Sequence, residues 1–174
     1  MGSRRRLLAG GVALCLTALG GCGFALRASQ PLPFDTIAVT PERGPGVAAL
    51  LTRTLGKQVR PVAPGADGVA PDVILDILEE TRKKVIVSVT TSGQVREYEL
   101  HLNVSFRVRT PQGAELQPKA TIERIASVSY SETAALAKEA EEAMLYRDMQ
   151  SDVAQQLLRR LALLHIPAKA VAAP

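Results

Sequence analysis

The chain has 174 residues, of which 47% are hydrophobic and 22% are charged, so it is long enough to fold around one core. It carries 21 basic and 17 acidic residues, but three of the basic residues lie within the first six positions. Without those three the charge is close to balanced, and the chain has no Trp. These features argue against a nucleic-acid-binding protein, which would present a basic face with stacking aromatic side chains.

The first 22 residues combine charge, apolar length and small side chains in a fixed order. Three arginines, Arg4 to Arg6, precede an apolar run from Leu7 to Leu19, and Gly20-Gly21 precedes Cys22. The run is shorter than the ~20 residues that a transmembrane helix needs, and the order is typical of a lipoprotein signal. We therefore predict that residues 1–21 are removed and that Cys22 becomes the first residue, with an S-diacylglycerol and an N-palmitoyl group.

Two plainer interpretations are an ordinary secretory signal in which Cys22 is incidental, and a short buried helix with a free thiol. The occurrence of all the features in order favours the lipoprotein signal. Cys15 lies in the same run but follows the bulky Leu14, so we expect it to leave with the signal. The arginines also resemble a twin-arginine export signal, but nothing downstream looks like a cofactor enzyme that folds before export. We therefore favour the general secretory route.

Acylation would keep the mature chain on a membrane, because two or more acyl chains hold a protein stably. Gly23 follows the cysteine, whereas an aspartate at that place commonly retains bacterial lipoproteins at the inner membrane. We expect the protein at the outer membrane, facing the periplasm. Residues 22–33 include Pro31 and Pro33 and lack a sustained period, which is typical of a tether.

A folded domain is expected over residues 34–166, beginning with a strand and a helix. Residues 34–40 place alternate apolar side chains among polar ones, and Pro41 closes this strand. From residue 46 to 59 the apolar residues recur at intervals of three and four, which predicts one buried helical face. Pro61 prevents the helix from continuing.

Three more strands are expected in the middle of the chain. Residues 72–91 are mostly strand, with a bulge or bend at the charged segment 79–84. Residues 94–109 alternate apolar and polar side chains, so one face should be core and the other wet or in contact with a partner. Ser92-Gly93 predicts a hairpin turn between these two strands, with positive φ at the glycine. A third strand with weaker alternation covers residues 120–130.

The last element is a long helix from about residue 133 to about residue 164. At 1.5 Å per residue it would measure ~48 Å, close to the ~53 Å of the strand 94–109, so it can lie along the sheet. The order β-α-β-β-β-α predicts an α+β fold, a two-layer sandwich with two helices packed on one face of a four-stranded mixed sheet. The other face would be polar and uncovered, and residues 167–174 are expected to be a disordered tail.

We find no catalytic constellation in the sequence. His101 and His165 lack cysteines or paired carboxylates at metal-ligand spacing, so each is interpreted as a surface histidine. The chain has no nucleophile elbow, phosphate loop or glycine-rich dinucleotide turn. The glutamates in residues 139–142 are interpreted as a solvated helix face. We expect no enzyme activity, metal or cofactor.

Basic side chains are spread over the predicted sheet and the start of the long helix. Beside an apolar surface such groups could hold the phosphates and acyl chains of an anionic lipid, although charges of this kind are more often solubilising. They are Lys83, Lys84, Arg96, Arg107, Arg109, Lys119, Arg124 and Lys138.

Three local patterns occur in an order found in one protein family. They are Gly21-Cys22-Gly23-Phe24-Ala25-Leu26-Arg27 after the signal, Gly93-Gln94-Val95-Arg96-Glu97-Tyr98 at the hairpin, and the helix sequence 135–141 that continues through Tyr146-Arg147-Asp148-Met149 to 156–161. Together they resemble the LptE (RlpB) family of lipopolysaccharide-assembly lipoproteins over nearly all of the mature chain. The resemblance implies the same fold, with two helices on a four-stranded sheet.

The resemblance also implies a role without catalysis. Members of the family plug the lumen of the outer-membrane β-barrel LptD, help it assemble and help deliver lipopolysaccharide to the outer leaflet. The polar sheet face and the hairpin residues Thr91, Ser92 and Gly93 would then contact the barrel wall or the passing lipid. The implied partners are therefore LptD in a one-to-one complex, lipopolysaccharide and the membrane that holds the acyl anchor.

For lipopolysaccharide binding, the family pattern points to basic residues at the helix start and near the hairpin tip. Lys138 fits the first place, whereas the tip has no basic residue, so Arg96 or Lys83 would have to reach the lipid instead. The runner-up function is an outer-membrane lipoprotein that serves another envelope complex, in barrel assembly or at the peptidoglycan. A lipid-anchored hydrolase ranks last, because the chain lacks a nucleophile-base pair.

Overall fold

The computed structural model describes residues 31–64, 68–130 and 135–166. Cys22, the predicted signal, most of the predicted tether and the predicted tail lie outside these ranges. None of the helices in the described part of the chain is both long enough and apolar enough to cross a bilayer.

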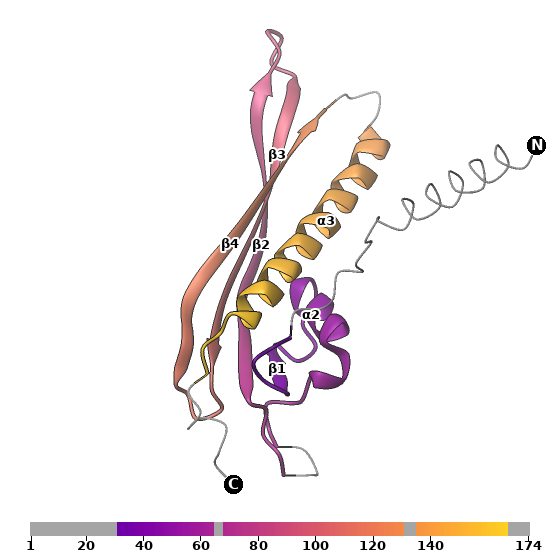
Figure 1. The fold of residues 1–174 in the computed structure, drawn as a ribbon. Coiled ribbons are helices and arrows are strands. Elements are labelled where there is room, and N and C mark those ends of the chain that lie inside the picture. Colours follow the sequence, from indigo (N-terminus) through magenta and orange to yellow (C-terminus); the bar gives the residue numbers. More distant parts are fainter. Residues whose placement is uncertain (1–30, 65–67, 131–134, 167–174) are drawn as a thin grey trace, which may run out of the picture. The chain divides into compact units, whose positions relative to one another are not determined.

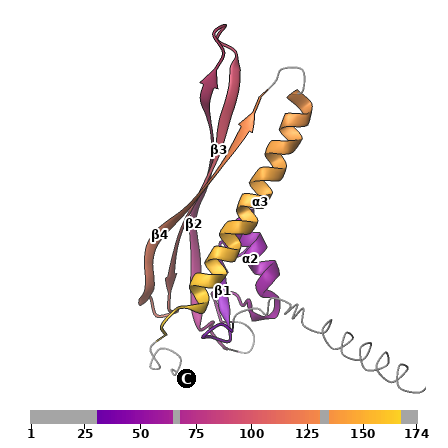
Figure 2. The same cartoon turned by 45° about the horizontal axis from the view of Figure 1, so that its top comes forward.

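The described residues form an α+β fold built on one sheet, as predicted. In chain order the elements are β1 (Ile37–Thr40), α2 (Val47–Leu55), a short 3₁₀ helix η2 (Gly56–Gln58), β2 (Val73–Val89), β3 (Val95–Arg109), β4 (Glu115–Ser129) and α3 (Ala135–Ala162). The sheet order is β1-β2-β3-β4, with β1 parallel to β2 and the other neighbours antiparallel. Both helices lie on one face of this mixed sheet (Figure 1, Figure 2).

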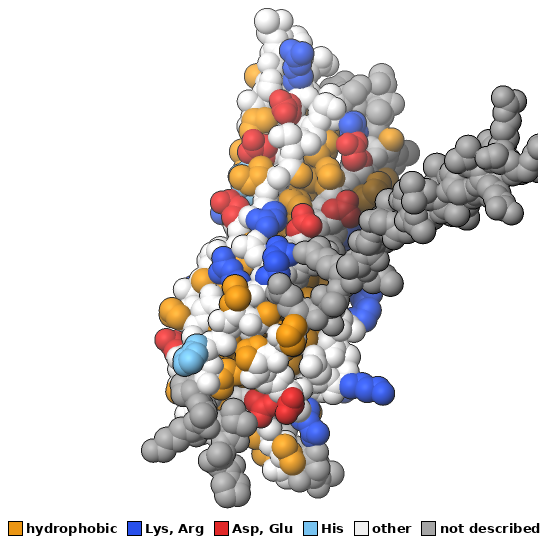
Figure 3. Space-filling model, viewed as in Figure 1, with side chains coloured by type: hydrophobic (Ala, Val, Ile, Leu, Met, Phe, Trp, Pro, Cys, Tyr) orange, Lys and Arg blue, Asp and Glu red, His pale blue; other side chains and the backbone are white. Residues whose placement is uncertain are grey.

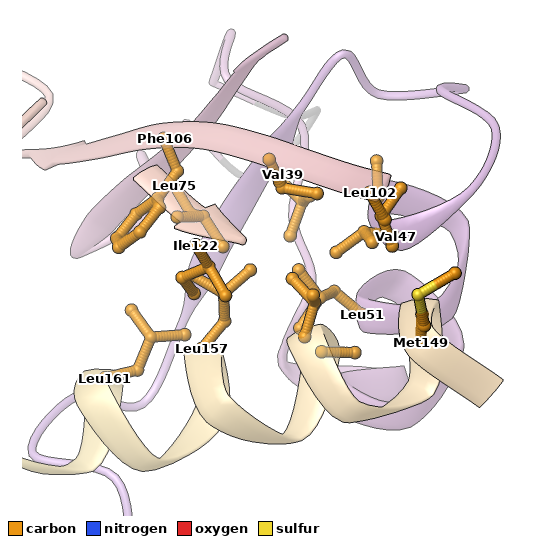
Figure 4. Close-up of a cluster of buried hydrophobic side chains, with 14 of the residues drawn as sticks. Val39, Val47, Leu51, Leu75, Leu102, Phe106, Ile122, Met149, Leu157 and Leu161 are labelled. Atoms are coloured by element: carbon orange, nitrogen blue, oxygen red, sulfur yellow. The ribbon is translucent and has the colours of Figure 1, made fainter. Parts of the chain in front are cut away.

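The core forms between the sheet and the helices, and β3 runs through its centre. Every second residue of β3 from Tyr98 to Val108 is at most 2% exposed, which confirms the predicted core face. These side chains cluster with an apolar stripe on α3 that includes Leu157 and Leu161, and with Leu51 of α2 (Figure 4). Burying one such side chain contributes roughly 1.5–3 kcal/mol relative to exposure, so this layer is the main source of stability.

The long helix lies lengthwise along the sheet because the two elements have similar lengths. The 28 residues of α3 rise ~42 Å, and the 15 residues of β3 span ~50 Å. Figure 1 shows α3 following the sheet from the hairpin end toward the opposite end. The helix can therefore bury its whole apolar stripe.

β2 continues through the charged segment 79–84, where the sequence predicts a bulge or bend. The register with β3 shifts between Ile77 and Glu79, which places the bulge at Leu78, just before the charges. The strand tolerates Glu80, Arg82 and Lys84 because each of these side chains finds a partner on a helix. Glu80 accepts the backbone N–H of Val47 at the start of α2, at 2.9 Å, and the side-chain amide of Gln150 on α3. This carboxylate thereby ties β2 to both helices.

The first helix ends earlier than the sequence pattern predicts. The expected helix extends to Val59, but α2 stops at Leu55, and Gly56 follows with a φ of 54°. Only glycine adopts such a φ readily, so the chain changes direction there. After the turn η2, Val59 forms an isolated bridge with Ile37 of β1.

The two β-hairpins use the same turn. Gly93 has a φ of 82° and donates its N–H to Thr90 O at 2.9 Å, and Gly113 has a φ of 92° and donates to Thr110 O at 2.9 Å. In both turns the threonine hydroxyl accepts the N–H of the residue after the glycine, at 3.1 and 3.2 Å. The predicted positive φ at Gly93 is confirmed, and these turns set the register of β2, β3 and β4.

A buried carboxylate, Asp76, joins the first three strands. The hydroxyl of Thr40 donates to Asp76 Oδ1 at 2.8 Å, and the Nε atoms of Arg107 and Arg109 each donate to Oδ2 at 2.8 Å. Burial alone would raise the pKa of this carboxyl group, but the hydrogen bonds from Arg109, Arg107 and Thr40 outweigh it and lower the pKa below the ordinary 3.8. Folding therefore favours the charged form of Asp76.

We expect Asp76→Asn to lower the free energy of unfolding by about 1.5–3 kcal/mol at neutral pH, the range for hydrogen bonds to a charged group. Because the folded pKa is lowered, this contribution is complete above pH ~4 and is lost as the pH falls through the folded pKa. Urea unfolding from neutral to strongly acidic pH should show the two stabilities converging in acid. Asp152→Asn on the exposed side of α3 is the matched control, and a loss at Asp76 that does not depend on pH contradicts the assignment.

Candidate functional site at the distal hairpin

The β2–β3 hairpin extends past the end of β4, beside the first turns of α3. The last residue of β4, Ser129, pairs with Glu97, so hairpin residues 89–95 lie beyond the pairing with β4. Figure 1 and Figure 2 both show the hairpin tip projecting past β4 and α3. We call this region the distal corner: residues 84–98, residues 129–130 and residues 137–146.

Basic side chains over aromatic rings hold the contact between β2 and α3. Lys84 Nζ lies 2.7 Å from Glu142 Oε2 and 4.0 Å from the centroid of the Tyr98 ring. Arg82 Cζ lies 4.9 Å from the centroid of the Tyr146 ring, whose hydroxyl donates to a backbone carbonyl of β2 at 3.1 Å. The hydrogen bond with Glu142 is the main reason that the pKa of Lys84 is raised, so its amine stays charged at neutral pH.

Lys138 and Arg96, both expected to contact lipid phosphates, lie against adjacent residues at the end of β4. Lys138 Nζ is 2.7 Å from Glu141 Oε2 and 3.4 Å from Ser129 Oγ. The backbone carbonyl of Arg96 accepts a hydrogen bond from the N–H of Tyr130 at 2.9 Å. The Arg96 side chain is exposed, and its guanidinium has no ion-pair partner among the described residues. The fold therefore brings these two cations to the same corner.

Lys83 lies apart from that pair. Its neighbour Lys84 contacts α3, and successive side chains of a strand point to opposite faces, so Lys83 points to the uncovered face. There it is opposite His101 of β3. The three basic residues singled out in the sequence are thus divided between the two faces of the sheet, and Lys84 takes the place beside α3.

The tip of the hairpin presents hydroxyl groups. Thr91, Ser92 and Gly93 are all exposed, and Ser92 Oγ lies 2.8 Å from Thr90 Oγ1. This pair of hydroxyls can offer hydrogen bonds to a partner, but any charge at the distal corner comes from residues behind the tip.

Apolar side chains are exposed along the distal part of β2, which the sequence analysis missed. Val85, Ile86, Val87 and Val89 are 43%, 59%, 47% and 57% exposed. The alternation that indicates a strand there also suggests a buried face, but neither helix covers this segment. In Figure 3 apolar side chains lie among charged ones on the hairpin-bearing part of the domain. Clustered exposed apolar residues of this kind mark contact surfaces.

The face of the sheet away from the helices is mostly polar, as predicted, although the exposed Val85 and Ile125 also lie on it. His101 lies on it between Glu99 and Glu123, with its ring nitrogens 3.1 and 3.3 Å from their carboxylates. His165, beyond the end of α3, is exposed. Across the described ranges, no three His, Cys, Asp or Glu side chains are grouped so that they could hold a metal ion.

Comparison with known proteins identifies relatives of the whole domain. Residues 34–161 match the family model described as LptE, lipopolysaccharide-assembly. The LPS-assembly lipoprotein LptE of Photorhabdus laumondii is 30% identical over 168 residues, which cover 93% of this chain and 88% of the relative. The protein of the same name from Yersinia enterocolitica is 32% identical over 165 residues, covering 93% and 78%.

Solved structures of lipoproteins share the fold. The solution structure of uncharacterized lipoprotein B from Nitrosomonas europaea has a TM-score of 0.62 at 34% identity, covering 80% of this chain and 90% of that chain. The crystal structure of rare lipoprotein B from Shewanella oneidensis has a TM-score of 0.58 at 25% identity, covering 73% and 92%. Sequence and fold comparisons therefore point to the same group of proteins.

We expect Lys84→Ala to lower the free energy of unfolding by about 1 kcal/mol, since it removes a partly exposed ion pair and a cation–π contact. A double-mutant cycle with Glu142→Gln, measured by urea unfolding, should give a coupling of about 0.5–1 kcal/mol that weakens in high salt. Lys83→Ala is the matched control on the same strand and should change stability by less than about 0.5 kcal/mol. Equal losses from the two lysines contradict this account of the β2–α3 contact.

Proposed function

Since the chain belongs to the LptE family of lipopolysaccharide-assembly lipoproteins, we propose that it plugs the LptD β-barrel, helps this barrel assemble and assists the delivery of lipopolysaccharide to the outer leaflet. The observation that carries the proposal is the family match over residues 34–161, which is nearly the whole folded domain. The family is one of accessory lipoproteins, so the role proposed is recognition and support of a partner.

Cys22 is the anchor in this proposal. Its S-diacylglycerol and N-palmitoyl groups would hold the chain on the periplasmic side of the outer membrane, since two or more acyl chains attach a protein stably. The tether of residues 22–33 could span up to ~40 Å when extended, at ~3.3 Å per residue. The domain that begins at Phe34 would therefore have the reach to enter a barrel beside its anchor.

The surface of the domain suits the lumen of a large barrel. The inward-facing side chains of large outer-membrane barrels are polar and line water-filled space. The uncovered face of the sheet is mostly polar, and the apolar face is closed by α3 and α2. The domain could therefore occupy such a lumen without exposing its core, with one-to-one stoichiometry because one plug fills one barrel.

The distal corner is the proposed contact with lipopolysaccharide. Lys138 and Arg96 offer two cations at one corner, and the exposed apolar residues of β2 lie beside them. A lipid A phosphate carries more charge than the carboxylate of Glu141, so it could draw Lys138 away from that partner. Lys83 would contribute from the other face of the sheet.

The hairpin tip would meet the barrel wall or the lipid. Thr91 and Ser92 are exposed and uncharged, so they can donate hydrogen bonds to either partner without a cost for burying charge. Gly93 keeps the tip narrow, since it carries no side chain in its positive-φ conformation.

We expect Lys138→Glu to weaken binding of lipopolysaccharide to the purified protein by about tenfold, because it replaces an attraction to phosphate with a repulsion. Titration with fluorescent lipopolysaccharide at fixed salt measures the change. Lys119→Glu, an equal change of charge at an exposed position of β4, is the matched control and should alter binding by less than about twofold. If Lys138→Glu binds like the unchanged protein, the role assigned to Lys138 is wrong.

Depletion of the protein in cells tests the proposed function as a whole. We expect lipopolysaccharide to stop reaching the cell surface, and properly assembled LptD to decline, because the barrel would lose its plug. Labelling of intact cells with a probe that cannot cross the outer membrane measures the amount of lipopolysaccharide at the cell surface. Normal surface lipopolysaccharide after depletion would instead favour an accessory role in another envelope complex.

A further inference from the structure

One edge of β2 has no neighbouring strand over most of its length. β1 pairs only residues 37–40 with residues 73–76, and the chain leaves the sheet at Pro41. β2 continues to Val89, paired on its other side with β3. Among the described residues, β2 is therefore an edge strand from Ile77 onward. Unpaired edges of this kind are templates for the addition of another strand.

The register shows which backbone groups face this free edge. The backbone N–H of Tyr130 donates to Arg96 O at 2.9 Å, so the carbonyl of Arg96 points toward β4. By alternation along β3, the N–H and C=O groups of even-numbered residues point toward β4, and those of odd-numbered residues point toward β2. Val85 pairs with Glu99 and so directs its backbone groups inward, toward β3. By alternation, the residues whose N–H and C=O groups face the free edge are Glu80, Arg82, Lys84 and Ile86.

Nothing in the sequence or register of this edge prevents another strand from pairing with it. The segment from Glu79 to Ile86 lies between two register shifts and is itself regular, so it can pair over its full length. It contains no proline, and its distal end carries the exposed apolar run that starts at Val85. At the other end, a shallow hollow between Pro45 and Leu78 continues the edge toward α2.

A lipid surface, an extended segment of another protein, or a second copy of this chain could cover such an edge. The hydrogen-bonding needs of the backbone distinguish a lipid surface from a polypeptide. A lipid surface would bury Val85, Ile86 and Val87 but would leave the free N–H and C=O groups of β2 without hydrogen bonds, which the hydrocarbon region does not tolerate. An extended polypeptide satisfies the backbone groups and covers the apolar side chains together. The exposed apolar run on an open edge therefore favours a strand.

Charge argues against a second copy of this chain in the one antiparallel register that uses all four free residues, Glu80, Arg82, Lys84 and Ile86. Antiparallel pairing of two copies, centred on the free backbone groups, would set Arg82 of one copy opposite Lys84 of the other, and Lys83 opposite Lys83. Like charges directly opposite each other in a sheet are destabilising. The complementary segment has acidic residues opposite Arg82 to Lys84 and apolar residues opposite Val85 to Val87.

We infer that an extended segment of the β-barrel partner adds to the free edge of β2 from Glu80 to Ile86, as a further strand of the sheet; this inference rests on the proposed function. The strands of the barrel wall are hydrogen-bonded on both sides and have no edge to offer. The added segment therefore comes from a loop or a chain terminus of the barrel protein. It carries acidic residues at one end and apolar residues at the other.

Residue-resolved hydrogen exchange on the full acylated protein, alone and in its complex with the barrel, tests the inference. In the free protein the amides of Thr81, Lys83 and Val85 should exchange slowly, and those of Arg82, Lys84 and Ile86 quickly. In the complex the second set should slow by at least about tenfold, because each amide gains a hydrogen bond. Contact through side chains alone would not produce this alternation.

Two substitutions at one position supply the matched pair. Ile86→Pro removes an N–H that faces the free edge, at a site where edge strands tolerate proline, whereas Ile86→Thr keeps the N–H and the branched shape. We expect Ile86→Pro to weaken the complex by at least about tenfold and Ile86→Thr by less than about threefold. Slow exchange of the Lys83 and Val85 amides verifies that each variant still folds.

The outcomes distinguish this inference from the proposed function. If the complex forms but the even-numbered amides stay unprotected, the inference is overturned and the plug proposal stands. If no complex forms, both are overturned. Protection by lipid vesicles alone, or by high concentrations of the protein alone, would identify a membrane surface or a second copy as the occupant and overturn the inference.

Discussion

The burial of one face of β3 beneath α3 and α2 is the interaction on which the rest of the structure depends. Alternate side chains of β3 supply a continuous apolar surface, and α3 is long enough to cover most of it. Because most apolar side chains of the sheet point toward the helices, the opposite face has little core to join and stays mostly polar. The hairpin extends past the first turns of α3, so its apolar residues remain exposed.

Two carboxylates hold this arrangement at separate places along β2. Asp76 joins β1, β2 and β3, and Glu80 joins β2 to the start of α2 and to the middle of α3. The protein is therefore fixed where its elements meet and open at the distal corner and along the free edge of β2. Such a distribution leaves two surfaces accessible for contacts in a protein of a lipopolysaccharide-assembly family.

The parts of the fold that depend on the spacing of apolar residues and on turn residues could be predicted from the sequence. The alternation in β3, the stripe on α3 and the glycine turn at Gly93 all follow from residues close together in the chain. The charged segment 79–84 also predicts a bulge or bend, but the position of the bulge at Leu78 does not follow from nearby residues, because the partners that stabilise β2 beyond it are 33 and 70 residues away from Glu80. That bulge decides the site: it reverses which residues face α3, so Lys84 meets Glu142 and Lys83 points to the uncovered face.

The central claim is that an acylated Cys22 holds this domain beside a β-barrel that it fills. Gentle detergent extraction of the outer membrane, followed by native mass spectrometry and by sequencing of the amino-terminal peptide, tests it most directly. The account predicts one copy of the protein bound to one copy of LptD, with a mature chain that starts at a lipid-modified Cys22. A protein recovered unattached, with a free thiol at position 22 and without a barrel companion, would contradict it.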